Sequence, residues 1–172
     1  LPFASYAQAT YPASAKKRTL RIAHITDVHM HNNPEDPKNA ARGLEKCLHH
    51  IQGLPDKADI IFNGGDSIDD ALDASRSKVK SQWKLWHQVM QGENALEVVD
   101  CIGNHDIWGS GPTQDPLYGK QWAMEEMGLA SRYRSFDRAG WHFIVLDSTY
   151  QTTEGWYTAK LDEEQFAWLK DD

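Results

Sequence analysis

The sequence predicts an α/β fold, in which a mainly parallel sheet carries helices on its outer faces and is followed by a hairpin. Short apolar runs alternate with amphipathic helical segments in units of about forty residues, which is typical of βαβ construction. The apolar runs are rich in Ile, Val and Phe on both faces, as expected for strands that are covered on both sides.

The predicted elements follow one another along the chain. Apolar runs that end at turn residues predict strands over 21–26, 59–63 and 96–102. Apolar residues three and four positions apart predict helices over 38–53, 75–91, 116–127 and 161–170. A hairpin is predicted over 133–146, with its turn at 138–140.

Length and composition favour one folded domain. A chain of 172 residues can bury a core, and its 40% hydrophobic content excludes a disordered chain. Residues 1–18 are the exception, and we expect a disordered arm or the remnant of a signal peptide there. Ala7, Gln8 and Ala9 have the small-x-small pattern of a cleavage site, which favours an exported protein, periplasmic or secreted. The alternative is an ordinary N-terminal arm of a cytoplasmic protein.

The charge of the chain limits its partners. A net charge of −7 argues against a broad nucleic-acid surface, because no excess of Lys or Arg is available to neutralise phosphates. No run of eighteen apolar residues exists, so we expect no membrane span. Cys47 and Cys101 are too few for a disulfide framework, and we expect small buried residues on a helix and a strand.

Polar side chains capable of binding metal follow all three predicted strands. They are Asp27, His29, Asp66, Asn104, His105 and Asp106. Because ligands bind beyond the carboxyl ends of parallel strands, these side chains are expected at one edge of the sheet. A single Asp or Asn after a strand is usually a turn former or a helix cap, and a single His is usually structural. Their occurrence at three successive strand ends instead predicts a site.

The motifs that contain these residues are similar to a known family. Asp27-Val28-His29, Gly65-Asp66 and Gly103-Asn104-His105-Asp106 resemble, in order and spacing, the first three motifs of the calcineurin-like metallophosphoesterases. Leu146-Asp147-Ser148 is also similar to a later stretch of that family. The resemblance implies that residues 19–172 form the N-terminal portion of a metallophosphoesterase domain, with part of its α/β sandwich.

The resemblance also implies a dinuclear metal site that hydrolyses phosphate mono- or diesters. Asp27 and His29 would bind the first ion, Asp66 would bridge both ions, and Asn104 would bind the second. Oxygen and imidazole ligands without thiolate suit Mn, Fe or Zn. A hydroxide between two cations would be the nucleophile, and the cations would neutralise the phosphoryl oxygens of the substrate.

Catalytic roles follow from the same resemblance. His105 would assist the leaving group, and Asp106 would orient the His105 ring. Trp108, just after this motif, could line the substrate pocket, as could His31 after the first motif. The acidic cluster at 69–73 is interpreted as charge at the N-terminus of the next helix.

Two further family segments, a lone His and a Gly-His-x-His run, are not in this sequence. His142 lies inside a predicted strand and is interpreted as structural. We therefore expect a truncated chain that is weakly active or inactive alone. Purple acid phosphatases have a Tyr where this chain has Asp69, which argues against an iron–tyrosinate site. The alternatives are a non-catalytic metal- or phosphate-binding domain on the same scaffold and a dinuclear hydrolase of amides.

Overall fold

A computed structural model describes residues 19–33, 39–152 and 157–172 of the chain. The predicted arm or signal remnant at 1–18 lies outside the described residues. The centre of the described structure is a parallel sheet of β1 (Ile22–Ile25), β2 (Ile60–Asn63) and β3 (Glu97–Asp100), in the order β1-β2-β3. The predicted parallel sheet is therefore confirmed.

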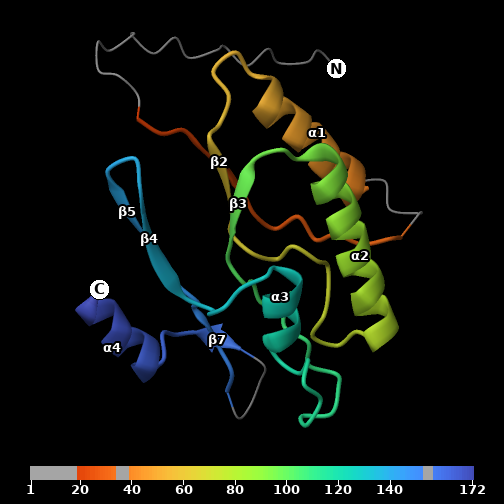
Figure 1. The fold of residues 1–172 in the computed structure, drawn as a ribbon. Coiled ribbons are helices and arrows are strands. Elements are labelled where there is room, and N and C mark those ends of the chain that lie inside the picture. The colour runs from red at the N-terminus through yellow and green to blue at the C-terminus, as the bar shows by residue number, and fades with distance from the viewer. Residues whose placement is uncertain (1–18, 34–38, 153–156) are drawn as a thin grey trace, which may run out of the picture.

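Two helices connect these strands and cover one face of the sheet. They are α1 (Ala40–Gly53) and α2 (Arg76–Glu93), which lie side by side in Figure 1. Their apolar stripes are buried and include Leu44, Leu48, Ile51, Val79, Trp83, Trp86 and Val89. The side chains of Asn39 and Ser75 cap the two helices by accepting hydrogen bonds from backbone N–H groups of the first turn.

The opposite face of the sheet is covered by an antiparallel hairpin of β4 (Arg134–Arg138) and β5 (Trp141–Val145). Successive residues of β2 divide between the two faces, as the pleat of a strand requires. Ile61 belongs to the core beneath the helices, whereas Ile60 packs with Val99 and Val145 on the hairpin side. The hairpin turn is tight, with φ of 53° at Ala139 and 80° at Gly140.

The last part of the chain contains α3 (Gln121–Glu126), β6 (Thr149–Tyr150), β7 (Thr158–Ala159) and α4 (Glu163–Asp171). The helix α3 is shorter than the predicted helix over 116–127. Trp108 and Gly119 exchange two backbone hydrogen bonds of 2.9 and 2.8 Å, and Gly119 has a φ of 71°, so the helix begins only after this turn. The amide of Gln165, which is fully buried, bonds the backbone of Asp147 and attaches α4 to the end of β5.

The two cysteines are free, and Cys47 is exposed. The prediction of a buried Cys47 is wrong, because α1 turns Leu44, Leu48 and Ile51 toward the core and leaves Cys47 beside them at the surface. Cys101 follows β3 and is half-buried. Within the described residues, none of the helices is both long enough and apolar enough to cross a membrane.

Candidate metal centre

The loops that follow the three strands meet at the carboxyl edge of the sheet. The first two run alongside each other through backbone hydrogen bonds, from Asp27 N to the Gly65 oxygen at 3.1 Å and from His29 N to the Asp66 oxygen at 3.0 Å. A third bond, of 3.0 Å, joins Met30 N to the Ser67 oxygen. These bonds extend the β1–β2 pairing beyond the strands and place His29 next to Asp66.

Glycine allows the second and third loops to approach each other closely. A Cβ atom on Gly103 would overlap the backbone nitrogen and the carboxylate of Asp66, and one on Gly65 would lie 2.5 Å from Gly103 N. Gly65 also has a φ of +100°, which residues with a side chain rarely adopt. Because of this approach, the backbone N–H of His105 donates to Asp66 Oδ1 at 2.9 Å.

Three residues of the predicted metal site have a left-handed backbone. The φ angles are 54° at Asp27, 50° at His29 and 52° at Asp66. Such a conformation costs about 1 kcal/mol or more for a residue with a side chain, and it persists only where the surrounding structure imposes it. Here the ladder between the first two loops holds Asp27, His29 and Asp66 through their own backbone groups.

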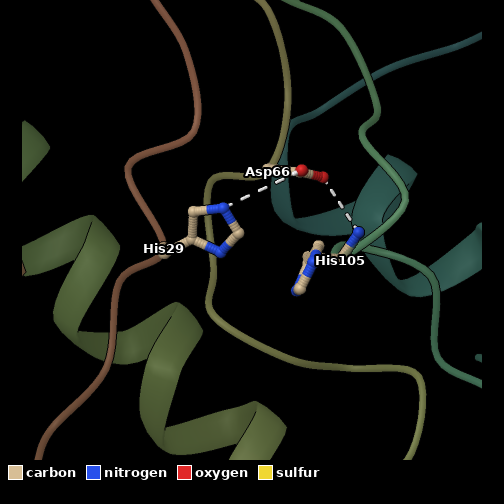
Figure 2. A group of neighbouring side chains, drawn as sticks. All are labelled: His29, Asp66 and His105. Atoms are coloured by element: carbon tan, nitrogen blue, oxygen red, sulfur yellow. Dashed lines mark hydrogen bonds and ion pairs between the residues drawn. The ribbon is translucent and has the colours of Figure 1, made fainter.

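The imidazole of His29 lies between two carboxylates. Its Nε2 atom is 3.9 Å from Asp27 Oδ1 and 4.0 Å from Asp66 Oδ2. These separations are too long for hydrogen bonds. They suit ligands of one shared ion, because metal–ligand distances of about 2.0–2.2 Å place two ligand atoms roughly 3–4 Å apart. Figure 2 shows His29 turned toward Asp66 across the site.

His105 completes a group of three side chains that could hold an ion. One ligand atom each of His29, Asp66 and His105 lies within 4.8 Å of the others. The two imidazole rings meet edge to face, with centroids 4.5 Å apart. The Nδ1 atom of His105 is hydrogen-bonded to the backbone oxygen of Asp69. A carbonyl oxygen only accepts hydrogen bonds, so Nδ1 carries the proton. The Nε2 atom is then the nitrogen that can bind a metal ion or exchange a proton with a substrate.

The carboxylate of Asp106 bonds backbone N–H groups and not the His105 ring that it was predicted to orient. Its buried carboxylate accepts hydrogen bonds from the backbone N–H groups of Ser67 at 2.9 Å, Ile68 at 3.2 Å and Gly103 at 2.9 Å. Burial raises the pKa of Asp106 to about 7, although these N–H groups oppose the shift. Asp106 thus joins the second and third loops, and the contact to the His105 ring comes from Asp69.

Asn104 and His105 face a cavity of about 430 Å³. Its other lining residues are Asp69, Asp70, Leu72, Asp73 and Tyr157. The Nδ2 atom of Asn104 donates to the hydroxyl of Tyr157 at 3.1 Å. Tyr157 is not predicted from the sequence, because a lone tyrosine 53 residues downstream carries no local signal.

Two expectations about the surroundings of the site need correction. Trp108 does not line this cavity, since it is 3% exposed, packs against Trp122 and donates its Nε1–H to the Ala74 oxygen. The acidic cluster belongs to the cavity wall rather than to the start of a helix, because α2 begins at Arg76, beyond Asp73. Trp83 and Trp86 of α2 lie in the core, with exposed fractions of 1% and 4%.

Comparison with known proteins agrees with this geometry. The model of the calcineurin-like phosphoesterase family matches residues 20–171, and the chain therefore belongs to that family. Membership indicates metal-dependent hydrolysis of phosphoesters, and the cluster of His29, Asp66 and His105 is a place where a metal could bind. A search of curated proteins found no match to the chain.

Proposed function

We propose that the strand-end loops form part of a dinuclear metal site that hydrolyses phosphate mono- or diesters. The observation that carries the proposal is the position of His29 Nε2, which lies 3.9 Å from Asp27 Oδ1 and 4.0 Å from Asp66 Oδ2. A nitrogen between two carboxylate oxygens at this spacing is a donor set for a divalent cation. Asp27 and His29 would hold the first ion, with Asp66 completing that side.

Asp66 is the residue that would be shared between the two ions. The His105 N–H holds Oδ1 at 2.9 Å, while Oδ2 is directed to the His29 side. Each carboxylate oxygen has two lone pairs, so Oδ1 can keep this hydrogen bond and still bind an ion. The second ion would take Asn104, through its amide oxygen.

The charge of the cavity explains why a phosphoester would need these ions. Asp69, Asp70 and Asp73 line the cavity, and the chain as a whole carries a net charge of −7. Such a surface repels an anionic ester unless cations are bound in the site. When bound, two divalent ions supply positive charge for the phosphoryl oxygens and make water more acidic.

His105 would act on the leaving group. Its Nδ1 proton is held by the Asp69 carbonyl, which fixes the ring and leaves Nε2 as the nitrogen that exchanges protons. With both nitrogens protonated, Nε2 would donate a proton to the departing oxygen as its bond to phosphorus breaks. The Asp69 contact would also stabilise the positive charge on the ring before the transfer.

Metal titration of the full chain tests the proposal. We expect the wild-type chain to bind Mn²⁺ in isothermal titration calorimetry and His29→Ala to lose binding at the first ion. His105→Ala should keep its metal and lose whatever turnover of nitrophenyl phosphate mono- and diesters the wild-type chain shows. The matched control is His142→Ala, because His142 lies on the hairpin and pairs with Asp137 at 2.7 Å.

Each result has a clear reading. Loss of Mn²⁺ from His105→Ala would make His105 a metal ligand, as its place in the three-residue cluster allows. Metal binding without any turnover in the wild-type chain would fit the weak or absent activity expected from the sequence as well as a non-catalytic metal- or phosphate-binding domain. A wild-type chain that binds no metal would contradict the proposal.

A further inference from the structure

Tyr157 approaches the candidate metal centre from a distant part of the chain. It immediately precedes β7, the strand that pairs with β6, and it lines the same cavity as Asn104 and His105. Its side chain is the only described tyrosine in the wall of this cavity, and the residue is 41% exposed. Its hydroxyl accepts a hydrogen bond of 3.1 Å from Asn104 Nδ2.

This hydrogen bond stabilises the orientation of the Asn104 amide in which Nδ2 faces the Tyr157 hydroxyl. An asparagine binds a hard cation through Oδ1 only, because its amide nitrogen is a donor without an available lone pair. Rotation of the amide by 180° would exchange the two atoms and point the nitrogen at the ion. With Nδ2 engaged by Tyr157, Oδ1 faces the other way. Among the described residues, the Tyr157 hydroxyl is the group that bonds this amide.

We propose that Tyr157 is a positioning residue, which orients Asn104 so that its amide oxygen binds the second metal ion. This inference rests on the proposed function, since it takes Asn104 to be a metal ligand. Groups that orient a metal ligand in this way typically contribute 10- to 100-fold to metal affinity. The hydroxyl of Tyr157, rather than its ring, carries the effect.

Tyr157→Phe tests the inference because it removes the hydroxyl and keeps the ring in the cavity wall. Mn²⁺ titration of the metal-free chain should show a roughly 10- to 100-fold loss of affinity for one ion and no change for the other. The melting temperature of the metal-free protein should stay the same, since a structural role would change stability and leave metal affinity intact. The matched control is Tyr133→Phe, which removes a hydroxyl that donates to Glu164 at 3.0 Å.

A double-mutant cycle with Asn104→Ala shows whether the effect passes through Asn104. We expect Tyr157→Phe to cause no further loss once Asn104 has been replaced. An equal loss in the Asn104→Ala background would overturn the inference, and so would an Asn104→Ala chain that binds Mn²⁺ like the wild type.

The remaining outcomes separate the inference from the proposed function. If the wild type binds two ions and Tyr157→Phe binds both equally well, the positioning role is wrong and the proposed function stands. If the wild-type chain binds no Mn²⁺, both are wrong.

Discussion

The carboxyl edge of the parallel sheet and the turn of the β4–β5 hairpin both contain residues with a side chain and a left-handed backbone. In the hairpin this is Ala139, with φ of 53°, and it closes a tight turn between adjacent strands. At the sheet edge Asp27, His29 and Asp66 adopt similar angles, but they are held by bonds between loops from different strands.

Aspartates show the same contrast between the two regions. Asp106 at the sheet edge is fully buried and accepts three backbone N–H groups from two loops. Asp137 of the hairpin has a side chain that is 83% exposed and bonds His142 on the neighbouring strand. In the hairpin, the left-handed residue and the aspartate contact only neighbouring parts of the same hairpin. At the sheet edge, the left-handed residues and the buried aspartate join loops that are far apart in the sequence.

The largest effect is expected from Gly103→Ala. The added Cβ would overlap the backbone nitrogen and carboxylate of Asp66, so the second and third loops would have to separate. We expect loss of Mn²⁺ binding and a large fall in melting temperature. Gly92→Ala is the control, because the added Cβ would have nothing within 4 Å and alanine favours a helix more than glycine does. A Gly103→Ala chain with normal metal binding would show that the close approach is unnecessary.

Asp106→Ala is expected to have the next largest effect. Three N–H groups, two of them buried, would lose their acceptor, which lowers the free energy of unfolding by roughly 2–5 kcal/mol. The loss is limited because the carboxylate itself resists burial, as its raised pKa of about 7 indicates. Asp137→Ala in the exposed hairpin pair should change stability little. Urea unfolding of both variants measures the difference, and equal losses would remove the contrast between the two regions.

A smaller effect is expected from Asp162→Ala at the start of α4. Asp162 caps the helix by accepting from Gln165 N at 2.8 Å, and it pairs with Arg132 at 2.6 Å. The Gln165 N–H is the main cause that lowers the pKa of Asp162 below 3.8, and Arg132 adds to it. Loss of the cap lowers the free energy of unfolding by about 1 kcal/mol.

The lowered pKa of Asp162 determines how its contribution to folding stability changes with pH. The folded state binds the Asp162 proton more weakly than the unfolded state, so the stabilisation is complete above pH 3.8 and declines as pH falls below it. Thermal unfolding of wild type and Asp162→Ala should therefore differ at pH 6 and converge in more acidic buffer. A difference that grows on acidification would refute the assignment.

Ala139→Gly should have the smallest effect and the opposite sign. Glycine adopts the positive φ of this turn without the steric cost of a Cβ, and we expect a gain of about 0.5 kcal/mol after its greater freedom in the unfolded chain is deducted. The control is Ala130→Gly, because Ala130 is exposed and has no positive φ, so the same change should destabilise. Urea unfolding measures both.

The sequence predicted the sheet, the helices and the hairpin because each has a local pattern. Ile60 and Ile61 stand in an apolar run, and Val79, Trp83 and Trp86 repeat at helical spacing. It also predicted that the polar strand ends would meet, since parallel strands share one edge. These features follow from the spacing of apolar residues and from the order of strands and helices, both of which can be seen in the sequence.

The contacts that orient the site could not be predicted in this way. The Asp69 contact to His105 uses a backbone carbonyl, which every residue has and which no motif marks. Tyr157 reaches Asn104 from 53 residues away through a hydrogen bond of its hydroxyl. Trp108 follows the third motif in sequence, yet its bulky ring is buried against Trp122, because an apolar neighbour stabilises it more than the polar cavity does.

The parallel pairing of the three strands also has a consequence for folding. Ile60 pairs with Ile22 on one side and with Glu97 on the other, so each pairing closes a long stretch of chain and forms slowly. A slip of one residue moves a strand by about 3.3 Å, which is close to the spacing between the ligand atoms. Misregistered chains would therefore lack the candidate metal centre, and on the proposed function Mn²⁺ added during refolding should favour the correct register by binding only to it.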